Sequence, residues 1–174
     1  MFERSDELAG IRPGLLSGPD VASPPRRTTG FASAVWIAAP PERVFDFCLD
    51  VESIKAMLPD RAEEAPGWNL EARLGGVYAF RYWVRGIFPL TTVVRIERFD
   101  RPSLIVDLQL RGLFRYWRHT HTCASEAQGT LYEDAVEFAT RFGPWVDRWL
   151  VRRDVAAMFA FRQSRMKELL ELPR

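Results

Sequence analysis

Residues 103–138, SLIVDLQLRGLFRYWRHTHTCASEAQGTLYEDAVEF, decide the fold. This stretch contains three runs rich in β-branched and aromatic residues, typical of strands, at 103–110, 114–125 and 130–138. The segments RGLF and EAQG separate these runs, and neither is long enough to hold a crossover helix. Neighbouring runs must therefore pair as antiparallel hairpins, and the sequence predicts an antiparallel sheet.

The pattern continues upstream of this stretch. Further strands are predicted at 31–37, 68–73, 77–86 and 90–99. Between the first two, APPERVFDFCLDVESIKAMLP favours two short helices, the second ending before Pro59.

The last part of the chain, GPWVDRWLVRRDVAAMFAFRQSRMKELLELPR, predicts one long helix beginning at Pro144. Apolar residues recur there at helical spacing: Val151, Val155, Met158, Phe159, Met166 and Leu169. A helix of about 27 residues is roughly 40 Å long. It must lie across the sheet, because no other element offers it an apolar partner, and the expected class is α+β.

Composition excludes several classes of protein. The net charge of +1 gives no sign of a nucleic-acid partner. Cys48 and Cys123 form no CxxC pattern, and no apolar run is long enough to span a membrane. We expect a soluble cytoplasmic protein with no membrane span. Residues 1–29, rich in proline, glycine and serine, are expected to be a flexible or extended arm, followed by a single domain over 30–174.

Strand alternation assigns the side chains to two faces. In 77–86 the even positions, which include Phe80 and Tyr82, are predicted to face the core. In 103–110 the even positions are all apolar, so Asp107 and Gln109 are predicted to face outward. In 114–125 the set containing Trp117, His119, His121 and Cys123 is the better inward candidate, because the other set carries an arginine and two threonines.

Loop lengths then predict which residues lie opposite one another. A four-residue RGLF loop places Leu108 opposite Trp117, and it brings Asp107 to Arg118 as an outer ion pair. A four-residue EAQG loop places His121 opposite Asp134. A slip of one residue in either hairpin would reverse every side chain of a strand.

Arg162 follows Val155 by seven residues, so it falls on the inward stripe of the terminal helix. A buried charge is costly unless it is paired. Arg162 is therefore expected to meet either Asp134 or a bound anion.

Three roles for the two histidines stay open: structural hydrogen bonding, ligand contact in a cavity, or acid–base catalysis by a His121–Asp134 dyad. Two histidines and one carboxylate are also the ligand set of non-haem iron enzymes. The third ligand would here be Asp134, through an inferred register, and the nearby Arg162 would oppose a cation. No metal and no other cofactor is expected.

The order of elements resembles the START-like helix-grip (SRPBCC) superfamily, and particular stretches resemble its bacterial polyketide cyclase/dehydrase-like branch. These are APPERVFDFCLDVESIKAMLP, FDRPSLIVDLQLRGLFRYWRHTHTC, GTLYEDAVEF and VRRDVAAMFAFR, within about residues 31–171. The resemblance implies a curved antiparallel sheet around a long C-terminal helix, with a cavity between them for a lipid, polyketide or aromatic compound. Its motif falls on Trp117, His119, His121, Asp107, Gln109, Asp134 and Arg162.

The leading hypothesis is a protein that binds an apolar ligand beneath the terminal helix. The polar end of the site would be formed by His119, His121, Asp134 and Arg162, and its apolar wall by Phe80, Tyr82, Trp117 and Phe159. The alternatives are an aromatase/cyclase or dehydratase, with His121 as base and Asp134 behind it, and a ligand-free interaction domain. The expected assembly is a monomer or homodimer, in which the N-terminal arm caps the cavity or a neighbouring subunit.

Overall fold

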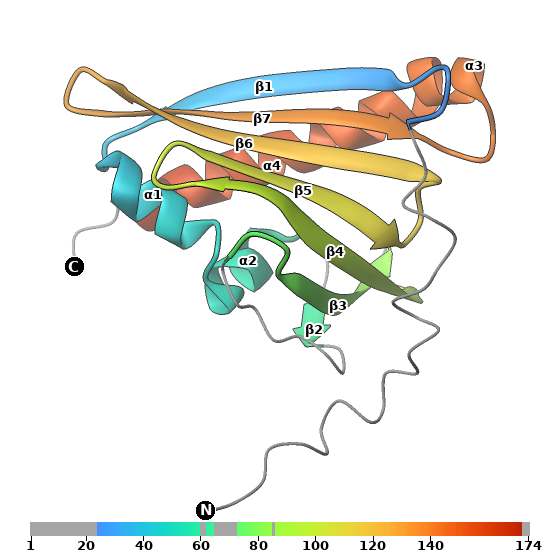
Figure 1. Ribbon diagram of the computed structural model, residues 1–174, viewed down its shortest axis with the longest axis horizontal. Coiled ribbons are helices and arrows are strands. Elements are labelled where there is room, and N and C mark those ends of the chain that lie inside the picture. Colours follow the sequence, from blue (N-terminus) through green and yellow to red (C-terminus); the bar gives the residue numbers. More distant parts are fainter. Residues whose placement is uncertain (1–23, 60–61, 65–72, 85, 172–174) are drawn as a thin grey trace, which may run out of the picture.

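The computed structural model describes residues 24–59, 62–64, 73–84 and 86–171. Its centre is a curved sheet in the strand order β1-β7-β6-β5-β4-β3-β2, in which every neighbouring pair is antiparallel (Figure 1). The strands are β1 (Thr29–Ile37), β2 (Ala62–Glu64), β3 (Val77–Val84), β4 (Phe88–Asp100), β5 (Leu104–Arg111), β6 (Tyr116–Glu126) and β7 (Gly129–Ala139).

Two short helices follow the first strand, as predicted. Helix α1 (Pro41–Phe47) begins at a proline, whose missing N–H costs nothing in a first turn. Helix α2 (Val51–Met57) begins after Asp50, whose side chain accepts a hydrogen bond of 2.8 Å from the backbone N–H of Ser53.

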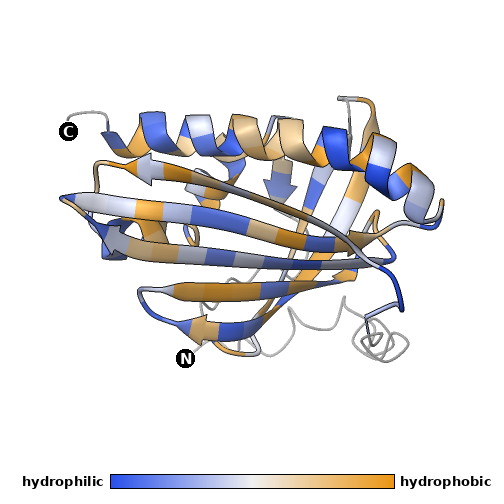
Figure 2. Cartoon of the chain, turned by 90° about the horizontal axis from the view of Figure 1, so that it is seen from above, coloured by the Kyte–Doolittle hydropathy of each residue, from blue (hydrophilic) through white to orange (hydrophobic). Residues whose placement is uncertain are grey.

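The terminal helix begins at Pro144 and continues to Glu171 through α3 (Pro144–Val146), the wider π-helical turn η3 (Asp147–Val151) and α4 (Arg152–Glu171). It crosses one face of the sheet (Figures 1 and 2). The buried Asp147 carboxylate anchors its start, because it accepts hydrogen bonds from the backbone N–H and the hydroxyl of Thr140, just beyond β7. The α+β helix-grip arrangement is therefore confirmed.

The helix is held to the sheet by two apolar clusters. Phe159 of α4 is fully buried, as is Phe138 of β7, and both belong to the cluster around Val136 and Val155. The second cluster joins α1 and the strands to the last turns of α4. Across the described part of the chain, no helix is long and apolar enough to cross a membrane.

The predicted pairing of β6 with β7 is confirmed. His121 lies opposite Asp134, Cys123 opposite Tyr132, and Ser125 opposite Thr130. The face of β7 that carries Asp134 is buried, since Tyr132, Asp134, Val136 and Phe138 are all at most 2% exposed. The short strand β2 was not predicted. The strand predicted at 68–73 lies outside the described residues except for Arg73, which is in a bend.

The predicted pairing of β5 with β6 is wrong by one residue. Leu108 lies opposite Arg118, and Asp107 lies opposite His119. The expected Asp107–Arg118 ion pair does not form, and Arg118 contacts Glu97 at 3.4 Å instead. The slip turns Asp107 and Gln109 to the interior, where both line a cavity. The apolar even positions of β5 face outward instead. Leu108 is nevertheless only 3% exposed there, so apolar character did not identify the inner face of this strand.

The two phenylalanines at positions 159 and 161 of α4 provide a stability test. Phe159 is 0% exposed and Phe161 is 45% exposed. Phe159→Ala should lower the free energy of unfolding by about 3–5 kcal/mol, because it leaves a cavity in the core. Phe161→Ala should lower it by less than about 1 kcal/mol. Urea denaturation followed by circular dichroism measures both, and equal losses would contradict the packing of this helix.

Candidate functional site

A cavity of about 170 Å³ lies between the inner face of the sheet, the α1–α2 segment and the terminal helix. Aromatic rings of β3 and β6 form much of its wall, and the polar groups gather on β5 and β6. The lining residues are Cys48, Ile54, Leu58, Pro59, Tyr78, Phe80, Tyr82, Thr92, Val94, Asp107, Gln109, Phe114, Trp117, His119, His121, Met158 and Arg162. The cavity therefore combines a mostly apolar wall with a concentrated polar region, as ligand sites commonly do.

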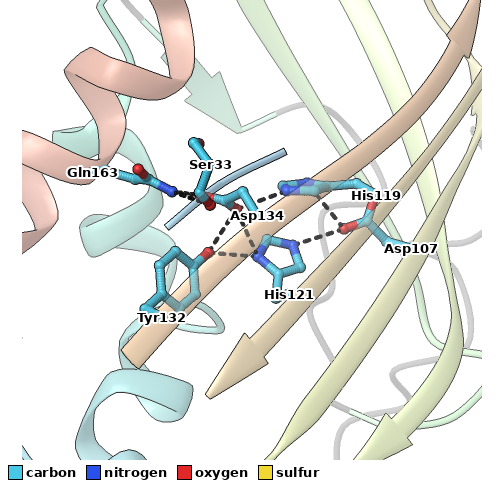
Figure 3. A network of polar contacts seen from close by, with 7 residues as sticks. All are labelled: Ser33, Asp107, His119, His121, Tyr132, Asp134 and Gln163. Carbon is cyan, nitrogen blue, oxygen red and sulfur yellow. Dashed lines mark hydrogen bonds and ion pairs between the residues drawn. The ribbon is translucent and has the colours of Figure 1, made fainter. Parts of the chain in front are cut away.

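The centre of the polar region is Asp134, which is 1% exposed (Figure 3). Its Oδ1 accepts hydrogen bonds from His119 Nε2 at 2.8 Å and from the Tyr132 hydroxyl at 2.8 Å. Its Oδ2 accepts a hydrogen bond of 2.9 Å from Gln163 Nε2. The carboxylate thus joins β6, β7 and α4, and several donors compensate its burial.

These contacts set the tautomers of both histidines. Asp134 accepts, so His119 carries its proton on Nε2 and leaves Nδ1 free toward the cavity. The Tyr132 hydroxyl gives its one hydrogen to Asp134, so it accepts from His121 Nδ1 at 2.7 Å. Neutral His121 therefore presents the lone pair of Nε2 to its neighbours.

His121 Nε2 lies 3.1 Å from Asp107 Oδ2, and His119 Nδ1 lies 3.7 Å from the same oxygen. The side chains of Asp107, His119 and His121 point toward one another in Figure 3. A carboxylate oxygen and a neutral imidazole nitrogen are both acceptors, so a cation must lie between them: a second proton on His121 or a metal ion.

Burial and neighbouring groups shift the pKa values of this cluster in different directions. Burial and the charge of His121 lower the pKa of His119 to about 4. Burial also disfavours the charge on His121, but hydrogen bonds to Asp107 and Asp134 hold its pKa well above the ordinary value. Despite burial, hydrogen bonds from both histidines keep the pKa of Asp134 well below its usual range. At neutral pH, His119 is uncharged and Asp134 is ionised.

Arg162 enters the cavity wall from α4 and is half-buried. Burial disfavours its charge, but Asp134, Tyr132, Cys48 and Asp107 together outweigh burial and raise the pKa of Arg162. Among the described residues, no carboxylate lies within ion-pair distance of its guanidinium, and its Cζ lies 5.1 Å from the centre of the Phe159 ring. The side chain on α4 that contacts Asp134 is Gln163. Of the two partners expected for Arg162, Asp134 is therefore wrong, and a bound anion stays a prediction.

Six of the eight predicted ligand-contact residues line the cavity: Phe80, Tyr82, Trp117, His119, His121 and Arg162. Phe159 lies in the core instead, where its ring stacks on that of Trp117 at 6.2 Å between centroids. Asp134 lies behind the histidines and does not line the cavity. The predicted His121–Asp134 dyad has a separation of 3.4 Å, whereas the direct partner of Asp134 is His119 at 2.8 Å.

Alternation along β5 predicts that Asp107 and Gln109 face outward, whereas both line the cavity. The sequence predicts no role for two residues of the network, Tyr132 and Gln163. Both apolar and polar positions of β5 are buried, with Val106 at 2% and Asp107 at 5% exposed. A strand buried on both faces loses the alternation that identifies its inner side. The signal that pointed to Asp107 and Gln109 was the family resemblance, whose motif includes both residues.

Three of the described residues could hold a metal ion: Asp107, His119 and His121. One ligand atom from each lies within 4.8 Å of those of the other two, and all three residues are buried. Cys48 also lines the cavity, and its thiol interacts with His121.

No family model matches the chain, and no curated protein matches it. Solved structures do match. A protein from Chromobacterium violaceum has 18% identity and a TM-score of 0.70, with 83% of this chain and 98% of that chain covered. A START superfamily protein from Mycobacterium smegmatis has 13% identity and a TM-score of 0.64, with 82% and 97% covered.

The Zhui aromatase/cyclase from Streptomyces sp. R1128 has 18% identity and a TM-score of 0.65, with 83% of this chain and 94% of that chain covered. At these identities the likeness concerns the fold. The chain has the START-like helix-grip fold that the sequence resemblance implied.

Gln163 provides a test of the network around Asp134. Gln163→Ala removes a donor from Asp134 Oδ2 and from the Ser33 carbonyl oxygen, which it also contacts at 3.0 Å. The free energy of unfolding should fall by about 2 kcal/mol, because buried acceptors lose their partner. Chemical denaturation measures this loss.

The matched control is Ser164→Ala on the exposed face of the same helix, which should change stability by less than about 0.5 kcal/mol. Gln163→Glu keeps the size of the side chain but places a carboxylate against Asp134, so it should destabilise the protein at least as much as Gln163→Ala. A Gln163→Glu variant as stable as the wild-type protein would show that Gln163 does not act as a donor.

Proposed function

We propose that the cavity binds a small apolar molecule that carries an acidic group, and that Arg162 contacts this group. The observation that carries the proposal is the guanidinium in the cavity wall, which has no carboxylate partner among the described residues. Nearby carboxylates stabilise the charge of Arg162 from a distance, but none of those described accepts from its N–H groups. A carboxylate on a bound molecule would supply this acceptor, and it would match the planar fork of arginine donors.

The apolar part of the ligand follows from the wall. Tyr78, Phe80 and Tyr82 form a row of rings on β3, with centroid separations of 6.4 and 5.8 Å. Trp117 and Phe114 add a second aromatic surface, with their ring centroids 4.5 Å apart. Aromatic side chains favour stacked or edge-on contact with another ring, so the wall suits an aromatic or cyclic molecule.

The size of the cavity limits the size of the ligand. At about 170 Å³ it is close to the volume of about 150 Å³ that accommodates one benzene ring in an engineered protein core. A compound of one or two rings fits this volume better than a long acyl chain. Binding of a small molecule also agrees with the fold, which is shared with a START superfamily protein and with an aromatase/cyclase.

A catalytic function is the weaker candidate. His121 lines the cavity, but Tyr132 and Asp107 engage both of its ring nitrogens, at 2.7 and 3.1 Å. A base must be within hydrogen-bond reach of the proton that it removes. With both nitrogens engaged by neighbouring side chains, His121 is better placed to hold the cavity in shape than to remove a proton from a substrate, and we rank binding first.

Isothermal titration of 2-naphthoate and of its neutral analogue 2-naphthamide, with a chelator present, tests the role of Arg162. The wild-type protein should bind the carboxylate more tightly than the amide. Arg162→Gln should weaken binding of 2-naphthoate about 10- to 100-fold, the value of one charged hydrogen bond, and should change binding of 2-naphthamide by less than about 3-fold.

The matched control is Arg153→Gln, on the exposed side of the same helix, which should leave both affinities unchanged. Equal weakening of acid and amide by Arg162→Gln would contradict an anion contact. Absence of binding of both compounds to the wild-type protein would contradict the proposed ligand class.

A further inference from the structure

We infer that Asp107, His119 and His121 form a binding site for one divalent transition-metal ion, with Asp107 Oδ2, His119 Nδ1 and His121 Nε2 as ligand atoms. Two neighbouring strands supply the three side chains: Asp107 and His119 lie opposite each other in the ladder between β5 and β6, and His121 lies two residues further along β6. All three line the same cavity and are at most 7% exposed.

The distances fit an ion. Ligand atoms about 2.1 Å from a metal, at angles between square and tetrahedral, lie about 3.0–3.4 Å from one another. Asp107 Oδ2 is 3.1 Å from His121 Nε2 and 3.7 Å from His119 Nδ1. One ligand atom from each of the three residues lies within 4.8 Å of those of the other two. Small side-chain rotations bring the three atoms around one centre.

The ring nitrogen of each histidine that does not face Asp107 has the kind of hydrogen-bond partner found in metal sites. Metal-bound histidines usually donate their other ring N–H to a carboxylate or another acceptor, which fixes the ring and its tautomer. His119 donates from Nε2 to Asp134 at 2.8 Å. His121 donates from Nδ1 to the Tyr132 hydroxyl at 2.7 Å, and that hydroxyl donates to Asp134. The remaining nitrogens, His119 Nδ1 and His121 Nε2, both face Asp107, and an incoming ion would replace the second proton that His121 Nε2 shares with this carboxylate.

The charges of the region also suit a cation. Once an ion replaces the second proton of His121, two buried carboxylates, Asp107 and Asp134, outnumber the single guanidinium of Arg162. The sequence-based argument against a metal took Asp134 as the third ligand and Arg162 as its neighbour. In the structure, Asp134 supports His119 from behind, and Asp107 completes the set.

The ligand set indicates the kind of ion. Two imidazole nitrogens and one carboxylate oxygen are borderline donors that suit Zn²⁺ or Fe²⁺ better than Mg²⁺ or Ca²⁺, which prefer oxygen ligands. Because three ligands do not complete the coordination of these ions, positions remain for an oxygen atom of a molecule in the cavity.

Titration of chelator-stripped, tag-free full-length protein with Co²⁺ tests the site directly. We expect saturable visible absorption at one Co²⁺ per chain, and stoichiometric competition by Zn²⁺. His121→Ala and Asp107→Asn should each lower the affinity for Co²⁺ by at least about 100-fold, and Tyr132→Phe, which removes a supporting hydrogen bond, by about 10-fold. Glu137→Gln, on the exposed side of β7, should bind Co²⁺ like the wild type.

A second measurement on the wild-type protein does not depend on whether the variants fold. Proton NMR of the Co²⁺-loaded protein should show two strongly shifted, exchangeable imidazole N–H signals, one from His119 Nε2–H and one from His121 Nδ1–H. The absence of saturable Co²⁺ and Zn²⁺ binding would overturn the inference and leave a proton between His121 and Asp107. Loading without two such signals would assign the ion to other residues and would also overturn it.

The inference does not depend on the proposed ligand, because the probe is the metal alone. Arg162→Gln separates the two: removal of a nearby positive charge should preserve or strengthen Co²⁺ binding, whereas it should weaken binding of 2-naphthoate. Loss of Co²⁺ binding in the folded Arg162→Gln protein would contradict the charge argument for the metal site.

Discussion

The buried carboxylate of Asp134 is the constraint on which the rest of the structure depends. At 1% exposure, an ionised aspartate is tolerated only if its oxygens are fully engaged. Histidine, tyrosine and glutamine side chains meet this requirement, and they come from β6, β7 and α4. The apolar clusters hold the helix against the sheet without specifying its position, because apolar contact is non-directional. The hydrogen bond from Gln163 to Asp134 adds a directional contact that specifies which turn of the helix lies above β7.

The polar network is satisfied on one side and open on the other. Asp134 has three donors within 2.9 Å. Asp107, only 5% exposed, has His121 at 3.1 Å and His119 at 3.7 Å as its polar side-chain neighbours among the described residues. The satisfied side faces the helix and stabilises the fold. The less satisfied side faces the cavity. There Asp107 can accept a further contact from a bound ion or molecule.

Much of the fold followed from the sequence, and the limits have a physical cause. The pairing of β6 with β7 was predictable because the EAQG turn and the alternation along β7 agree: Tyr132, Asp134, Val136 and Phe138 share one face. For β5 the length of the RGLF loop and the alternation of apolar residues both predicted the wrong register. Its even positions are all apolar, yet they face outward, where Val106 and Leu108 are still at most 3% exposed. Alternation identifies an inner face only when the outer face is exposed to water.

That one-residue slip changes the chemistry of the site more than its shape. With Asp107 outside, the two histidines would have one carboxylate, Asp134, and the cavity would contain mainly cationic and aromatic groups. With Asp107 inside, the histidines lie between two carboxylates. Asp134 then fixes the orientation of His119 directly and that of His121 through Tyr132. Both imidazoles therefore direct their remaining nitrogens toward Asp107, so the groups that stabilise the fold also prearrange those exposed to the cavity.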